Sequence, residues 1–145
     1  MKLEDIMNMW NEDAGISRDK IVEDSIKTSK LHAKYLQIYI NERNILKARE
    51  NDLKVLKREK FEFYTMGPTP ETHERGWKLP PQGKVIKSEV AMYIDSDSDI
   101  IALTQKIEIQ RAKVDFCSQV IDVLGRRSFT IKNIIDYEKF ISGAI

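Results

Sequence analysis

The sequence is poor in several features that define common classes of protein. It has one cysteine, Cys117, so no intrachain disulfide can form, and a reducing compartment fits best. It has no apolar run of membrane-spanning length, and charged residues interrupt its first ten positions, where a signal peptide would need an apolar core. We therefore expect a soluble protein of the cytosol that has no contact with a membrane.

Positive charge is not in excess either. The formal net charge of the 145 residues is +1, although charged residues make up 32% of the chain and hydrophobic residues 41%. This composition is too apolar for a disordered chain and suits long, half-solvated helices. Nucleic-acid binding would require cations that are gathered on one surface.

Proline and glycine are absent from Ser17 to Tyr64, which removes the residues that most often end a helix. Over this stretch the apolar residues recur at about 100° per residue and mark one side of a helix: Leu31, Tyr35, Ile38, Ile45, Leu53 and Leu56. The pattern predicts one very long helix, or two helices with a break near Asn41 to Asn44. An apolar stripe of this length needs other segments or other subunits to cover it.

The four prolines are instead gathered between Gly67 and Gly83, and they predict an exposed loop. The segments 61–64 and 85–94 on its two sides have some strand character, which allows a short β-hairpin to flank the loop.

Three further helices follow from apolar spacing and capping residues. Residues 3–10 form a short amphipathic pattern, and the aspartate-rich run 95–99 can cap a helix that extends from about 99 to 124. A last short helix covers about 130–142. The sequence thus predicts a mainly α fold in a single domain, 1–145, which consists of an N-terminal helical part (1–66), a loop (67–94) and a C-terminal helical part (95–145).

Residues for catalysis or metal binding are lacking as well. If Asp95 began a calcium-binding loop, Ile100 would replace the required glycine and Lys106 the required bidentate glutamate. The two histidines lie in different segments, without the spacing of a zinc site. Cys117 lies on an apolar helix, as a packing residue does. We expect no enzymatic activity, no metal and no cofactor.

One half of the long helix carries a basic stripe within an arc of about 100°. The stripe consists of Arg43, Lys47, Lys54, Lys57 and Arg58, and it is followed by Phe61, Phe63 and Tyr64. Cations beside aromatic rings are how proteins hold single-stranded nucleic acid without reading its sequence. A solvated helix face with rings that close the core is the other interpretation, and the residues alone leave both open.

The order of short motifs along the chain resembles the UvsY family of bacteriophage recombination mediators. The segment 115–118 reads D-F-C-S, and 127–132 reads R-S-F-T-I-K. Further matching positions are Leu3 to Asp5, Leu31, Lys34, Leu36, Lys87 to Glu89, Asp99, Asp122, Ile134 and Asp136. The resemblance covers nearly the whole chain.

This resemblance implies a small helical protein that assembles as a heptameric open-barrel ring in the cytoplasm of the infected bacterial host. It further implies non-specific binding of single-stranded DNA, opposition to the phage single-strand-binding protein and loading of a RecA-like recombinase. In the family, a Lys-x-Arg motif precedes an acidic–aromatic–aromatic triplet. Here the triplet is 62–64 and the basic positions are Arg58 and Lys60, so lysine and arginine are exchanged.

Two sets of site residues follow from the stripe and the resemblance together. The predicted DNA-binding residues are Arg43, Lys47, Lys54, Lys57, Arg58, Lys60 and Tyr64. The predicted residues of the homo-oligomer interface are Phe116, Val120, Leu124, Phe129, Ile131, Ile134, Ile135 and Phe140. An intrachain helical core is the other interpretation of the second set. A coiled-coil scaffold, or an adaptor that binds only proteins, is the alternative function.

Overall fold

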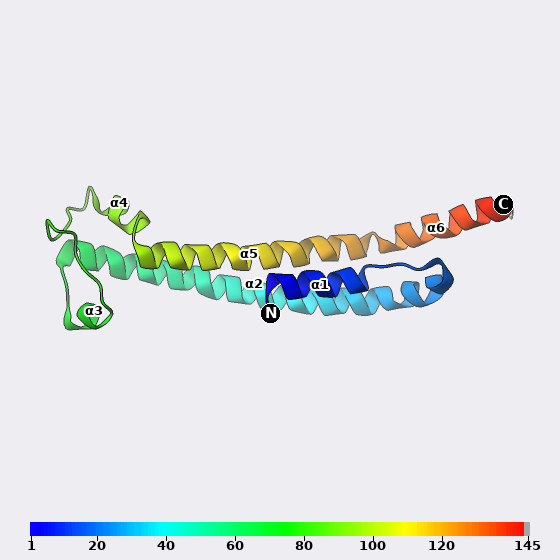
Figure 1. Cartoon of the computed structure of the whole chain (residues 1–145), viewed down its shortest axis with the longest axis horizontal. Helices are drawn as coiled ribbons and strands as arrows, with labels where there is room; N and C mark the ends of the chain where they lie inside the picture. The colour runs from blue at the N-terminus through cyan, green and yellow to red at the C-terminus, as the bar shows by residue number, and fades with distance from the viewer. Residues whose placement is uncertain (144–145) are drawn as a thin grey trace. The chain divides into compact units, whose positions relative to one another are not determined.

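The computed structural model of the chain describes residues 1–143, and this part is mainly helical (Figure 1). Its elements are α1 (Leu3–Asp13), a 3-10 turn (Arg18–Lys20), α2 (Ile21–Met66), α3 (Pro70–Glu74), α4 (Val90–Asp95), α5 (Ser98–Gly125) and α6 (Arg127–Ser142). None of these helices combines the length and the apolar character that are needed to cross a membrane.

The chain forms two compact units, and each long helix contributes residues to both. Within the described residues, the first unit comprises 1–44 and 109–143, and the second comprises 45–108. The three sequence-based parts, 1–66, 67–94 and 95–145, follow the order of the elements along the chain and stay a prediction.

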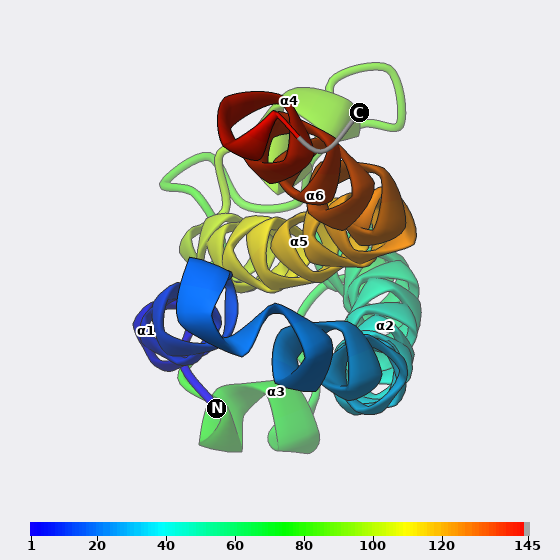
Figure 2. The same cartoon turned by 90° about the vertical axis from the view of Figure 1, so that its right-hand side faces the viewer.

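In the first unit, α1 packs on the first part of α2 after a reversal of the chain at residues 14–20 (Figure 2). Tyr35 of α2 is fully buried, and the ring of Trp10 meets it edge-on at 5.3 Å between centroids. Val120 and Leu124 of α5 complete this core. The Tyr35 hydroxyl donates to the Asp13 carboxylate at 2.8 Å, so α1 is fixed by a polar contact as well as by packing.

Arg127, the first residue of α6, is also part of the first unit, and only 4% of it is exposed. Its guanidinium group donates to the carbonyl oxygens of Asp13, Ala14 and Gly15, each at 3.4 Å. These carbonyls belong to the last residue of α1 and to the two residues after it, where a helix leaves its last acceptors without partners. The beginning of α6 therefore caps the end of α1.

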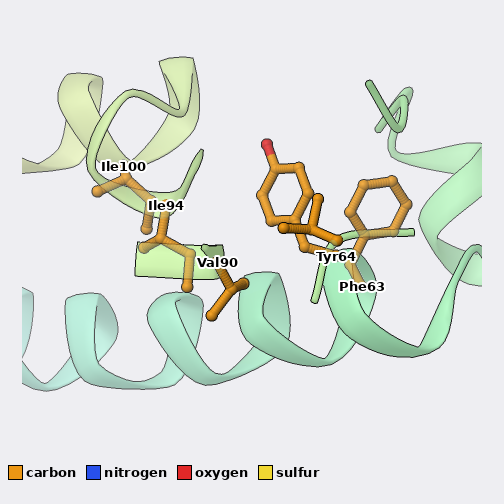
Figure 3. Close-up of a cluster of buried hydrophobic side chains, with 6 residues drawn as sticks. Phe63, Tyr64, Val90, Ile94 and Ile100 are labelled. Carbon is orange, nitrogen blue, oxygen red and sulfur yellow. The ribbon is translucent and has the colours of Figure 1, made fainter. Parts of the chain in front are cut away.

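The second unit has a core of its own, built from the end of α2, the connection after α3, α4 and the start of α5. Figure 3 shows Phe63 and Tyr64 of α2 with Val90 and Ile94 of α4 and Ile100 of α5. Val85, from the connection between α3 and α4, joins the same core, and Trp77 and Leu79 pack against it. The connection is thus held to the end of α2 by apolar contacts.

Local sequence explains where these elements begin and end. Gly67 has φ +99, a left-handed conformation that suits glycine, and α2 ends at the residue before it. Thr69 caps α3 by accepting a hydrogen bond from the Thr72 N–H, with Pro70 in the first turn. Asp97 caps α5, because its Oδ1 accepts from the N–H groups of Asp99 at 2.9 Å and Ile100 at 3.2 Å.

The structure confirms a mainly α fold and one long helix without a break near residues 41–44. The predicted β-hairpin is wrong, since no strand occurs between residues 1 and 143. Residues 61–64 continue α2, and 90–95 form α4. The strand-like residues are large and apolar because they fill the core of the second unit, which is a requirement that helices and strands share.

Candidate nucleic-acid interface

The second unit carries a cationic face on the last part of α2. Lys47, Lys54, Lys57 and Arg58 are all exposed. Arg58 has 69% of its side chain in solvent and contacts Glu62 only loosely, with 4.0 Å between Nε and Oε1. An exposed pair of this kind contributes little energy, so Arg58 remains able to meet an anion. We call these four residues the basic face.

Arg43 belongs to the first unit and is treated separately. It is exposed, and its guanidinium carbon lies 5.6 Å from the centroid of the Tyr39 ring. The charge is therefore accessible while the side chain rests against an aromatic neighbour.

Lys60 has a different setting from the one the sequence suggested. Only 3% of it is exposed, and its Nζ lies 3.1 Å from Asp97 Oδ2 and 2.8 Å from Asp99 Oδ2. The same ammonium group lies 3.8 Å from the centroid of the Trp77 ring. Two carboxylates and a ring face surround its three N–H donors, so in this conformation Lys60 has no donor directed to solvent.

Tyr64 is likewise buried, and its hydroxyl donates to Asp97 Oδ2 at 2.6 Å. Burial raises the pKa of the Tyr64 hydroxyl above its ordinary value, and the bond to Asp97 raises it further. Burial also acts to raise the pKa of Asp97, but the hydrogen bonds from Tyr64 and Lys60 outweigh it and hold that pKa below its usual range. Asp97 is thus a fixed, charged carboxylate inside the unit.

The exposed placement expected for Lys60 and Tyr64 is therefore corrected, and helix geometry gives the reason. Lys60 follows Leu56 by four residues and precedes Phe63 by three, so it lies on the side of α2 that faces the core. The basic face lies beside that side. Spacing alone was enough to reveal this placement. It could not reveal the carboxylate partners, which lie 37 and 39 positions further along the chain.

The sequence did not indicate that the loop after α2 takes part in the same arrangement. Arg75 pairs with Glu59 of α2, and its guanidinium carbon lies 4.0 Å from the centroid of the Trp77 ring. Trp77 therefore contacts two cations, Lys60 and Arg75. A tryptophan in a proline-rich loop indicates a packing contact, but the loop sequence does not say that Trp77 contacts Lys60 and Arg75.

The residues predicted for the oligomer interface divide into buried and exposed sets. Val120, Leu124 and Ile131 are buried within the first unit, at 2%, 3% and 6% exposure. Phe116 and Ile134 are half-buried. In contrast, Phe129 and Phe140 of α6 are 67% and 70% exposed, and further large apolar side chains are exposed with them: Val22, Ile26, Ile135 and Ile141. Several large apolar side chains of α6, and two of the first turns of α2, are therefore exposed to solvent.

A family model described as "Recombination, repair and ssDNA binding protein UvsY" matches residues 9–144. The chain belongs to the UvsY family. The curated relative "Recombination protein uvsY" of Enterobacteria phage T4 is 24% identical over 144 residues, which cover 99% of each chain. The UvsY family is defined by recombination, repair and DNA binding, and the chain is accordingly not an enzyme.

Solved structures of one UvsY protein share the fold. A crystal structure of the bacteriophage T4 recombination mediator protein UvsY, in lattice type II, has a TM-score of 0.82 at 22% identity, with 98% of each chain covered. The lattice type I structure has a TM-score of 0.79 at 21% identity and covers 94% of this chain and 98% of that one. Sequence divergence at this level leaves the fold intact while the residues of individual sites can differ.

Proposed function

We propose that the chain is a recombination mediator that binds single-stranded DNA without sequence preference. In this proposal it counteracts a single-strand-binding protein and promotes loading of a RecA-like recombinase, in the cytoplasm of an infected bacterium. Membership of the UvsY family supports DNA binding in recombination and repair. The actions on the single-strand-binding protein and on the recombinase extend this proposal beyond DNA binding.

The basic face is the observation that carries this proposal. Lys54, Lys57 and Arg58 belong to one five-residue stretch of α2, and all three side chains are exposed. Cations on a rigid helix can follow the phosphates of a strand, and they read no base edges. On single strands each neutralised phosphate contributes about 0.7 to the slope of log affinity against log salt concentration. Lys47 is the fourth residue of the basic face, and Arg43 of the first unit is proposed as a separate contact.

Assembly supplies the affinity that one basic face lacks. We propose that the exposed side chains of α6, with Phe129 and Phe140 most prominent, pack against neighbouring copies in a ring, for which the family resemblance suggests seven subunits. Val120, Leu124 and Ile131 support this surface from inside the unit. A ring presents the basic face repeatedly, and the effective concentration of the remaining faces strengthens binding once one of them is occupied.

A direct test compares the wild type with the triple variant K54A/K57A/R58A. Fluorescence anisotropy with a short labelled oligonucleotide, measured over a salt series, should show weaker binding and a slope that is shallower by about 2 for three lost contacts. Sedimentation of the same samples should show an unchanged assembly. The variant K27A/K30A/K132A is the matched control, because it removes three exposed lysines of the first unit.

Equal affinity in the two triple variants would place the DNA site elsewhere. A wild type that assembles but binds no oligonucleotide, even at low salt, would favour the alternative function, a scaffold or an adaptor that binds only proteins. The exposed apolar residues of α6 would serve such a protein equally well.

A further inference from the structure

The second unit contains a cleft of about 520 Å³, and none of the four residues of the basic face lines it. Three segments line it: the end of α2, the loop after α3, and the corner between α4 and α5. Its cations are Lys60, Arg75 and Lys78, and its carboxylates are Asp97 and Asp99. The lining thus combines more positive than negative groups, with Lys60 at the place where the two signs meet.

The two carboxylates that hold Lys60 differ in how firmly they are fixed. Asp97 is 8% exposed and accepts hydrogen bonds from the Tyr64 hydroxyl and from two N–H groups at the start of α5. Asp99 has 51% of its side chain in solvent and meets Lys60 at 2.8 Å. Asp97 therefore stays in place when the surroundings change, whereas Asp99 can turn to water at little cost.

A phosphate oxygen can replace Asp99 at this position. A carboxylate and a phosphate both accept charge-assisted hydrogen bonds from an ammonium group, at similar distances. If Asp99 turned away, Asp97 would still balance Lys60, and Lys78 would remain along the cleft together with Arg75, which is also paired with Glu59. The anion that enters would then meet two further cations that Asp99 does not contact.

We propose that the Asp99 carboxylate occupies the place of a strand phosphate in this cleft when DNA is absent, so that Lys60, which the family resemblance assigns to DNA binding, meets the strand at a second phosphate site only by exchange. Binding of the strand exchanges an internal carboxylate for a backbone phosphate at Lys60. The site lies in the same unit as the basic face, so it can add a contact for the same strand. The inference rests on the proposed function, because the anion is the backbone of single-stranded DNA.

The variant Asp99→Asn tests this exchange, and Asp95→Asn is its matched control. Both remove one exposed negative charge from the same region, but Asp95 does not line the cleft. Release of this ion pair, in which Asp99 is half-exposed, corresponds to a gain of about two- to fivefold for each site. Anisotropy with a short oligonucleotide should therefore show tighter binding for D99N than for D95N, and adding Lys78→Ala to D99N should reduce the gain.

Trp77 provides a second readout that does not depend on affinity. Its ring contacts Lys60, so a new anion at Lys60 should change its emission, and Trp10→Phe removes the other tryptophan. In W10F, saturation with the oligonucleotide should shift or quench the fluorescence. The same titration in W10F/D99N should reach this end point at a lower concentration.

The outcomes separate the two proposals. Equal affinities of D99N and D95N, or saturation of W10F without a change in emission, would overturn the second site while the basic face still accounts for binding. If the wild type binds no oligonucleotide, the proposed function fails and the second site fails with it.

Discussion

Replacement of Lys60 by methionine should destabilise the second unit, because it leaves the buried Asp97 carboxylate without its cation. Removal of one partner from a buried ion pair costs about 3–5 kcal/mol. Asp97 keeps its hydrogen bonds from Tyr64, Asp99 and Ile100, so we expect the low end, about 3 kcal/mol. For a chain of this length that is a fall in Tm of roughly 6–12 °C.

The effect should depend on pH in a defined direction. The pKa of Asp97 in the folded wild type is depressed, so its contribution to stability is fully present above the unfolded pKa, near 4, and is lost as pH falls through the folded value. In K60M, protonation removes the uncompensated charge. The difference in stability between the two proteins should therefore be largest near pH 7 and shrink below pH 4.

Urea unfolding followed by Trp77 emission, in a Trp10→Phe background and at one fixed protein concentration, measures this difference. The control is Lys57→Met, which removes an exposed lysine one turn earlier and should change the free energy of unfolding by less than about 0.5 kcal/mol. If K60M and K57M unfold at the same urea concentration at pH 7, Lys60 does not neutralise Asp97, and the reasoning is refuted.

Three other outcomes are expected. Phe129→Ser with Phe140→Ser should lower the sedimentation coefficient and leave helical circular dichroism unchanged, since both rings are exposed; an unchanged assembly would contradict the proposed interface. Arg127→Met should destabilise the first unit by about 1–3 kcal/mol in urea, because part-buried carbonyl oxygens lose their donor, and a neutral result would mean that water replaces it. Asp13→Asn should cost stability at pH 7, and the cost should shrink as pH falls from 4 through the pKa of folded Asp13. Burial acts to raise that pKa, but hydrogen bonds from Lys34 and Tyr35 lower it overall, and a cost that does not change with pH would refute this.

Helix content could be predicted from the sequence, whereas the polar contacts inside the units could not. The stretch without glycine or proline, and the capping aspartates before α5, define helices through local geometry. The choice between helix and strand for 61–64 was wrong because large apolar residues satisfy both. Tertiary packing, which local rules do not contain, decided it.

The candidate site shows the same division. The charges of Lys54, Lys57 and Arg58 are exposed, as the spacing of the basic stripe predicts. The setting of Lys60 depends on Asp97, Asp99 and Trp77, which reach it only after the chain has reversed direction through the loop. A pattern along one helix contains no information about residues that fold over it from elsewhere.

The contact between Arg127 and the end of α1 affects how an experiment on a protein without α6 must be interpreted. Cleaving off α6 withdraws the guanidinium group from the carbonyls of residues 13–15, and the N-terminal helix loses its anchor together with the C-terminal one. A defect in such a truncated chain would combine damage at both termini. Point changes on the outer surface of α6 leave that anchor in place and isolate the contribution of subunit association.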